Sequence, residues 1–238
     1  MRIPLIVPLL WLAVTTALAQ TTALAQTPAP AQTNKPNAFE KEILAFEASD
    51  RTNPPPRHAI LFVGSSSIRL WKTLAQDFPN RRVINRGFGG SQIADSILFA
   101  DRIVLPYEPA TIVFYAGGND LNAGKTPQVV FHDYKTFVEK VRTKLPDTQI
   151  AYISIAGNPA RWSQIERVRE ANRLIQAYSR TLPGLSYIDT ATAMLGADGL
   201  PRPEIFVADK LHMNTNGYAI WTRVIGAHLQ QLDAEKKP

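Results

Sequence analysis

The hydrophobic positions of the chain alternate between short apolar runs and longer segments with helical spacing. Five short runs, rich in β-branched and aromatic residues like strands buried on both faces, lie at 59–63, 83–85, 111–115, 149–155 and 185–188. Helical periodicity is found at 127–145, at 162–178 and from Tyr218 to Leu229. Strands that alternate with helices predict one parallel sheet with right-handed crossovers and helices on both faces.

The chain before the first predicted strand divides into two parts. Phe39, Ile43 and Phe46 mark a short amphipathic helix, which the prolines at 54–56 end. The preceding segment, 26–37, is rich in proline and small polar residues and has no apolar periodicity, which is typical of a linker. With 45% hydrophobic residues among 238, the chain can build one sizeable core, so we predict a single domain over 38–238.

The first 25 residues have the pattern of a signal peptide. Arg2 precedes an apolar run that ends at Val14, and no further charge follows until Lys35. The hexapeptide Thr-Thr-Ala-Leu-Ala-Gln occurs at 15–20 and again at 21–26, so each copy offers a small-residue cleavage site. We therefore expect a signal peptide over 1–25, export to the periplasm or the medium, and no membrane span after cleavage. An uncleaved anchor helix is the alternative.

Charge and cysteine content exclude several classes of function. The formal net charge of +6 is mild and is not gathered into a Lys/Arg block, so we expect no nucleic-acid partner. The absence of cysteine removes disulfides, thiolate metal sites and a cysteine nucleophile.

Polar and glycine-rich clusters follow three of the predicted strands, and a fourth cluster precedes the last helix, at 64–67, 85–91, 116–120 and 208–212. Ligands of parallel α/β sheets bind beyond the carboxyl ends of the strands, so these clusters are expected to converge on one site. Each cluster alone also fits an ordinary turn or helix cap. Their occurrence together, in this order relative to the strands, favours a shared ligand-binding site over four unrelated turns or caps.

The first cluster has the residue types of an acyl-transfer site. Ser65, Ser66 and Ser67 follow a strand and begin a predicted helix, where backbone N–H groups point outward without partners. A serine oxygen placed there can attack a carbonyl carbon while a neighbouring N–H stabilises the negative charge that develops.

The four clusters together resemble the four sequence blocks of the SGNH (GDSL-type) hydrolases. The blocks are Gly64-Ser65-Ser66, Gly87-Phe88-Gly89-Gly90, Gly117-Gly118-Asn119-Asp120 and Asp209-Lys210-Leu211-His212, and the resemblance extends over about 60–230. The chain is most similar to the branch with lysophospholipase-like esterases and platelet-activating-factor acetylhydrolase catalytic subunits. The resemblance implies a three-layer α/β/α, flavodoxin-like fold with a five-stranded parallel sheet, and ester hydrolysis without a metal or other cofactor.

The resemblance also implies a role for each site residue. Ser66 would be the nucleophile, His212 would accept its proton, and Asp209 would orient His212. The backbone N–H groups of Ser66 and Gly90 and the side-chain amide of Asn119 would form the oxyanion hole.

Three ambiguities stay open in the sequence. Ser65 stands where the family usually has Asp, and the run of serines leaves Ser65 and Ser67 as alternatives to Ser66. Asp189, after the last predicted strand, is an alternative to Asp209 as the partner of His212. Asp120 is expected to hold its loop rather than to react.

The substrate is predicted only by class. No long apolar lid and no membrane-binding stripe is found, which favours small or polar acyl esters, including acylated glycans or lysolipids. Arg161 and Trp162 are candidates for substrate contact at the mouth of the cleft, and an ordinary helix start with a packed indole is the alternative. An acyltransferase with the same residues and a non-catalytic acyl-sugar-binding protein are the alternative functions.

Overall fold

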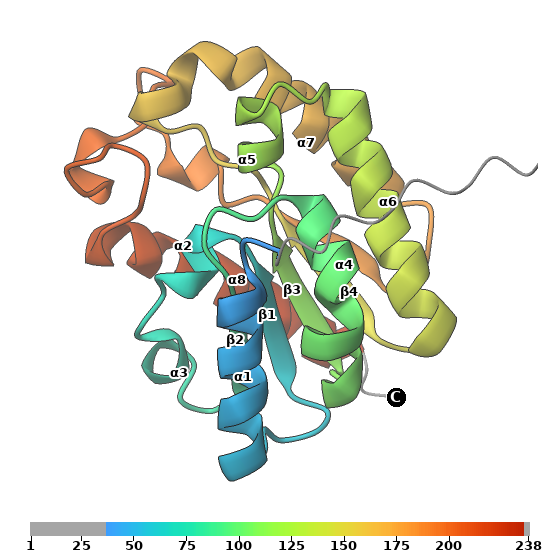
Figure 1. The fold of residues 1–238 in the computed structure, drawn as a ribbon. Helices are drawn as coiled ribbons and strands as arrows, with labels where there is room; N and C mark the ends of the chain where they lie inside the picture. The colour runs from blue at the N-terminus through green and yellow to red at the C-terminus, as the bar shows by residue number, and fades with distance from the viewer. Residues whose placement is uncertain (1–36, 236–238) are drawn as a thin grey trace, which may run out of the picture. The chain divides into compact units, whose positions relative to one another are not determined.

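The sheet of the computed structural model, which describes residues 37–235, has five parallel strands. The predicted signal peptide, and the predicted linker up to residue 36, lie outside the described residues. The strands are β1 (Ile60–Gly64), β2 (Val83–Gly87), β3 (Thr111–Tyr115), β4 (Gln149–Ile153) and β5 (Leu185–Ile188), in the order β2-β1-β3-β4-β5 (Figure 1). Every neighbouring pair is parallel, so the carboxyl ends of all five strands lie at one edge. The predicted sheet is confirmed.

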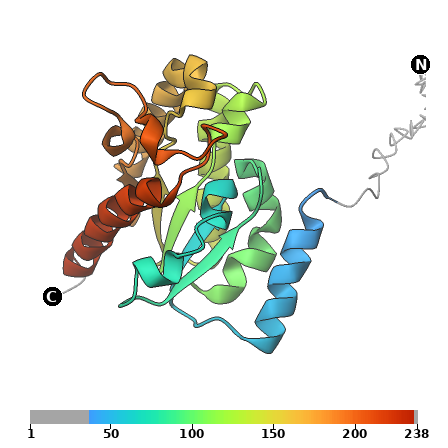
Figure 2. The same ribbon diagram turned by 90° about the vertical axis from the view of Figure 1, so that its left-hand side faces the viewer.

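Helices cover both faces of this sheet (Figures 1 and 2). One face carries α1 (Glu40–Thr52), α4 (Ile93–Ile103), α6 (Pro127–Lys144) and α7 (Ile165–Ser179), and the other carries α2 (Ser66–Arg69), α3 (Leu74–Asp77) and α8 (Thr215–Glu235). The short α5 (Gly118–Asn122) follows β3, and four 3-10 turns complete the chain: η1 (Leu105–Tyr107), η2 (Pro159–Gln164), η3 (Thr192–Met194) and η4 (Pro203–Ile205). The three-layer α/β/α prediction is confirmed.

The side-chain alternation of the strands builds the two cores. In β1, Leu61 and Val63 join the core under α4 and α6, while Phe62 lies between them in sequence and packs on the other face. There Phe62 contacts Trp71, whose ring packs edge to face against Trp221 of α8. Both faces of β1 are buried, which explains its apolar sequence, whereas the edge strand β2 also contains Asn85 and Arg86.

Several predicted boundaries differ from the structure, among them 83–85, where the strand continues to Gly87, and the following two. The strand predicted at 149–155 ends at Ile153, because the chain then bends into the η2 turn. The helix predicted at 162–178 begins at Ile165; before it, Arg161 has φ −130° and ψ 26°, outside the helical range. Among residues 37–235, no helix is long and apolar enough to cross a membrane.

The end of β1 explains how the chain turns toward the site. Gly64 has φ +141°, and a Cβ atom there would lie 1.9 Å from the carbonyl oxygen of Tyr115 on β3. Only glycine allows the two strands to approach so closely at this point. The next residue donates its N–H to the same Tyr115 oxygen at 2.9 Å, which fixes the start of α2 at the carboxyl edge of the sheet.

Candidate active site

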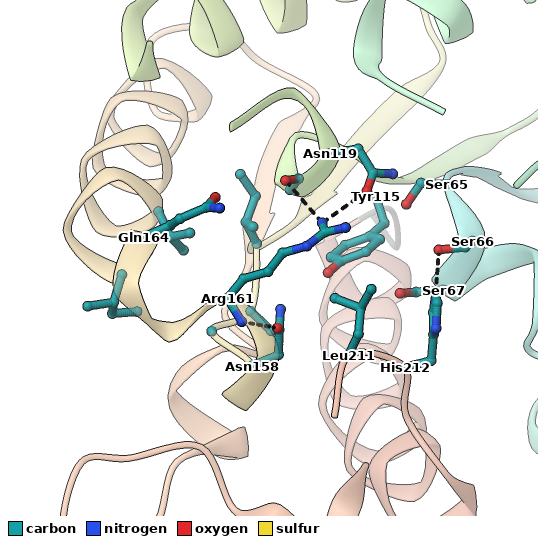
Figure 3. A pocket seen from close by; sticks show the side chains of 16 residues that line it. Ser65, Ser66, Ser67, Tyr115, Asn119, Asn158, Arg161, Gln164, Leu211 and His212 are labelled. Atoms are coloured by element: carbon teal, nitrogen blue, oxygen red, sulfur yellow. Dashed lines mark hydrogen bonds between the residues drawn. The ribbon is translucent and has the colours of Figure 1, made fainter. Parts of the chain in front are cut away.

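The side chain of Ser66, the first residue of α2, contacts a histidine from the other end of the domain. Its Oγ lies 2.9 Å from Nε2 of His212, and the two residues are 146 positions apart (Figure 3). Of the three consecutive serines, only Ser66 makes this hydrogen bond. Ser65 occupies the N-cap position of α2, but its hydroxyl makes no capping hydrogen bond. The geometry therefore singles out Ser66 in the serine run.

The other ring nitrogen of His212 is held by Asp209. Nδ1 lies 2.6 Å from one carboxylate oxygen, and the other oxygen accepts the backbone N–H groups of Leu211 at 2.8 Å and His212 at 2.9 Å. Two hydrogen bonds from His212 lower the pKa of Asp209 to about 2, and the bond from the backbone N–H has a larger effect than the bond from the imidazole. Since the ionised carboxylate can only accept, Nδ1 carries the proton and Nε2 is left to accept the Ser66 hydroxyl.

The turn that carries Asp209 and His212 is held at both of its ends. Phe206 and Met213 form an antiparallel bridge, and the N–H of Val207 donates to the carbonyl of His212 at 2.9 Å. The side chain of Asn214 then caps α8 by accepting the N–H of Asn216 at 2.9 Å. Asp189, the alternative carboxylate, instead bonds the N–H and hydroxyl of Thr192.

Two backbone donors predicted for the oxyanion hole have no acceptor within 37–235. The N–H of Ser66 is the first of a helix, and that of Gly90 lies in the loop after β2, where φ is +72°. Neither donates to another group of the described chain. Gly90 is exposed and does not line the pocket beside Ser66.

Asn119, at the start of α5, connects the second and third clusters. Its side-chain nitrogen donates to the carbonyl of Ser91 at 3.0 Å, and its side-chain oxygen accepts from Arg161 at 3.0 Å. The neighbouring Asp120 is fully buried and accepts the N–H of Ile93 and the ammonium of Lys125. Burial raises the pKa of Asp120, and its contacts fit the loop-holding role that the sequence indicates.

A pocket between these loops adjoins Ser66 and His212 (Figure 3). Of its sixteen lining residues, Arg161 is the one with a permanent positive charge, and none is a carboxylate. Trp162 does not line it; the indole lies against Gly157, where an added Cβ would come within 2.7 Å of the ring. Substrate contact by Arg161 and Trp162 stays a prediction, although the position of Arg161 in the pocket agrees with it.

One residue at the site has no signal in the sequence. Glu42 of α1, which the helical pattern places on a polar face, accepts the N–H of Gly89 beside Gly90. Only the folded arrangement of α1 and the loop after β2 reveals this contact. As for metal ligands, residues 37–235 contain no group of three His, Asp or Glu side chains that could hold an ion.

The fold is shared with solved esterase-like structures at low sequence identity. A Streptococcus pneumonia protein, provisionally described as a platelet activating factor, superposes with a TM-score of 0.71 at 18% identity over 80% of this chain and 92% of that one. A GDSL-like lipase from Bacteroides thetaiotaomicron gives 0.68 at 18% identity over 80% and 98%. A variant of an acetyl-xylooligosaccharide esterase from Geobacillus gives 0.56 at 15% identity over 71% and 93%.

Sequence comparison identifies the family directly. No curated protein matches the chain. The sequence profile of the GDSL-like lipase/acylhydrolase family matches residues 61–220, a span that contains the serine run, both glycine clusters and the Asp209–His212 turn. The chain belongs to the GDSL-like lipase/acylhydrolase family.

Proposed function

We propose that the protein is a serine esterase that hydrolyses carboxylic esters through Ser66, His212 and Asp209. The observation that carries this proposal is the continuous hydrogen-bonded chain from the Ser66 hydroxyl through both ring nitrogens of His212 to the Asp209 carboxylate. Such a chain activates a hydroxyl that is otherwise a weak nucleophile. Membership of an acylhydrolase family supports the same reaction.

The first half of the reaction forms an acyl-enzyme. Oγ of Ser66 attacks the carbonyl carbon of the ester while its proton passes to Nε2 of His212. The carbonyl oxygen becomes negatively charged, and the N–H groups of Ser66 and Gly90 and the amide of Asn119 donate to it. The bond to the alcohol oxygen then breaks, and that oxygen takes the proton from His212.

The second half returns the enzyme to its starting state. Water attacks the acyl carbon and gives one proton to Nε2 of His212, which passes it to Ser66 as the carboxylic acid leaves. Asp209 stays ionised throughout and stabilises the imidazolium, as its low pKa allows. If an alcohol replaced water in this half, the same residues would perform acyl transfer.

We propose small or polar acyl esters as substrates, with acylated glycans or lysolipids as the natural sources. The pocket supports this class because it combines apolar side chains, Ile155, Ile165 and Leu211, with several amides and hydroxyls. A structurally similar Geobacillus protein is an acetyl-xylooligosaccharide esterase, which agrees with an acetylated glycan.

The reaction is tested with p-nitrophenyl acetate and butyrate. The wild-type protein is expected to turn over at least one of them, and Ser66→Ala to abolish turnover, while Ser67→Ala serves as the matched control in the same run. A fluorophosphonate probe followed by peptide mass spectrometry should label Ser66. Equal, background rates for the wild-type protein and Ser66→Ala, with folding intact, would reject catalysis and favour a non-catalytic binding protein.

We also propose that the protein is exported through a signal peptide over residues 1–25. The positive residue, apolar run and repeated small-residue sites described above support it. N-terminal sequencing of protein expressed in a Gram-negative host and recovered from the periplasm should begin at Gln20 or Gln26. A chain that retains Met1 in the membrane fraction would show an uncleaved anchor.

A further inference from the structure

Arg161 reaches across the pocket to the residue proposed for the oxyanion hole (Figure 3). Its Nη1 lies 3.0 Å from the side-chain oxygen of Asn119 and 3.4 Å from the carbonyl of Gly118. The guanidinium forms no salt bridge with any carboxylate of residues 37–235. A permanent charge in the pocket is thus directed at an amide and a carbonyl oxygen rather than at an acid.

The two partners of Asn119 leave only one orientation for its amide. A guanidinium can only donate, so the group facing Arg161 must be the amide oxygen. The carbonyl of Ser91 can only accept, so the group facing Ser91 must be the amide nitrogen. That nitrogen carries two hydrogens, of which the Ser91 carbonyl uses one. In Figure 3 the nitrogen lies on the side of Ser65 and Ser66.

The backbone around Arg161 is itself fixed to the loop that carries His212. The side chain of Asn158 accepts the N–H of Arg161 at 3.0 Å, and the N–H of Ala160 donates to the carbonyl of Lys210 at 3.1 Å. Lys210 lies between Asp209 and His212 and has a positive φ of 57°. The backbone from which the Arg161 side chain extends is therefore tied to the loop that carries the proposed base.

We propose that Arg161 is a positioning residue, which holds the amide of Asn119 so that its second N–H is available to the oxyanion. The proposal rests on the proposed esterase function. Without Arg161, the amide oxygen loses its charged partner and the amide gains the freedom to rotate, which would turn an acceptor toward the developing negative charge. A donor that is aligned before the reaction stabilises the transition state more than one that must reorient.

The test is a double-mutant cycle on kcat and KM with p-nitrophenyl acetate, a neutral ester. Arg161→Gln is expected to lower kcat roughly tenfold or more, the size of effect typical of a lost hydrogen bond to a charged group, with little change in KM. In the Asn119→Ala background, Arg161→Gln should cost nothing further, because the amide through which it acts is gone. Arg161→Lys, which keeps a charged donor, should recover part of the rate.

Controls separate this role from folding and from direct substrate binding. Arg173→Gln removes an exposed arginine of α7 and should leave kcat unchanged, and thermal unfolding should show that all variants fold. Losses that multiply in the double variant would overturn the proposal. So would an Arg161→Gln effect confined to KM for an anionic ester such as mono-p-nitrophenyl succinate, which would make Arg161 a substrate anchor. A wild-type protein without turnover on either ester would reject the esterase function itself, and this inference with it.

Discussion

Both carboxylate oxygens of Glu42, on α1, lie 3.2 Å from the backbone nitrogen of Gly89 in the loop after β2. Glu42 also lies 3.9 Å from Arg69, at the end of the helix that begins with Ser66. The side chain therefore connects α1 with the two segments that carry the nucleophile and the Gly90 donor. Helix α1 precedes the span that matches the family profile.

Replacement of Glu42 by Gln should slow the reaction through the Gly90 loop. A neutral amide accepts a weaker hydrogen bond than a carboxylate, so the loop loses part of its anchor, and kcat is expected to fall by roughly three- to tenfold. Steady-state kinetics with p-nitrophenyl acetate measure the change. Glu47→Gln, which removes a carboxylate of the same helix that pairs with Arg102, should leave kcat unaltered. Equal losses in the two variants would point to α1 stability rather than to the loop.

Replacement of Asn119 by Ala should remove an oxyanion donor. We expect kcat to fall roughly a hundredfold or more, equivalent to about 3 kcal/mol of transition-state stabilisation. KM should change little, because the donor acts mainly on charge that develops after binding. Asn122→Ala, in the same helix but bonded to Gln164, provides the control. A normal rate for Asn119→Ala would exclude Asn119 from the mechanism.

Replacement of Asp209 by Asn should disturb the proton position on His212. An amide can donate to Nδ1, which favours the ring form in which Nε2 carries the proton and no longer accepts from Ser66. The expected loss in kcat is about a thousandfold to ten-thousandfold. Asp189→Asn, whose side chain caps Thr192, should retain most of the activity. If Asp189→Asn lost more activity than Asp209→Asn, Asp189 would be the acidic partner of His212 instead.

Acid should destabilise the fold through His228 of α8. Its Nε2 lies 2.8 Å from the hydroxyl of Ser186, and burial lowers its pKa, an effect that Glu235 opposes. Because the unfolded chain then binds this proton at a higher pH than the folded chain, the free energy of unfolding falls as the pH drops through the ordinary imidazole range. Thermal unfolding between pH 8 and pH 5 should show a shallower pH dependence for His228→Gln. If the pH dependence of thermal unfolding were the same in His228→Gln and the wild-type protein, groups other than His228 would dominate it.

The parts of the molecule that the sequence could predict depend on local patterns. The strands at 111–115 and 185–188 have the predicted bounds, because a run of β-branched and aromatic residues between polar turns is best buried as a strand. The contact between Asp209 and His212 is also local, since three residues separate them on one turn. Features formed within a few consecutive residues can be predicted without knowing the rest of the fold.

The parts that the sequence could not predict depend on distant segments. Glu42 lies 47 residues from Gly89, and Arg161 lies 42 residues from Asn119. No periodicity connects such pairs. The first joins α1, which packs on one face of the sheet, to the loop after β2, and the second joins the loops that follow the neighbouring strands β3 and β4. The non-helical backbone of Arg161 also lies beside a long-range contact, since the N–H of the preceding Ala160 donates to the carbonyl of Lys210, and α7 begins only at Ile165.

The turn that joins Asp209 to His212 keeps its acid and base together through hydrogen bonds of its own, whereas one bond of 2.9 Å connects the pair to Ser66. A displacement of this turn would move the acid and the base together, so that the Ser66 hydroxyl would lose its proton acceptor while the bond between Asp209 and His212 stayed intact. The activity of the serine therefore depends on where this turn lies relative to the first residue of α2.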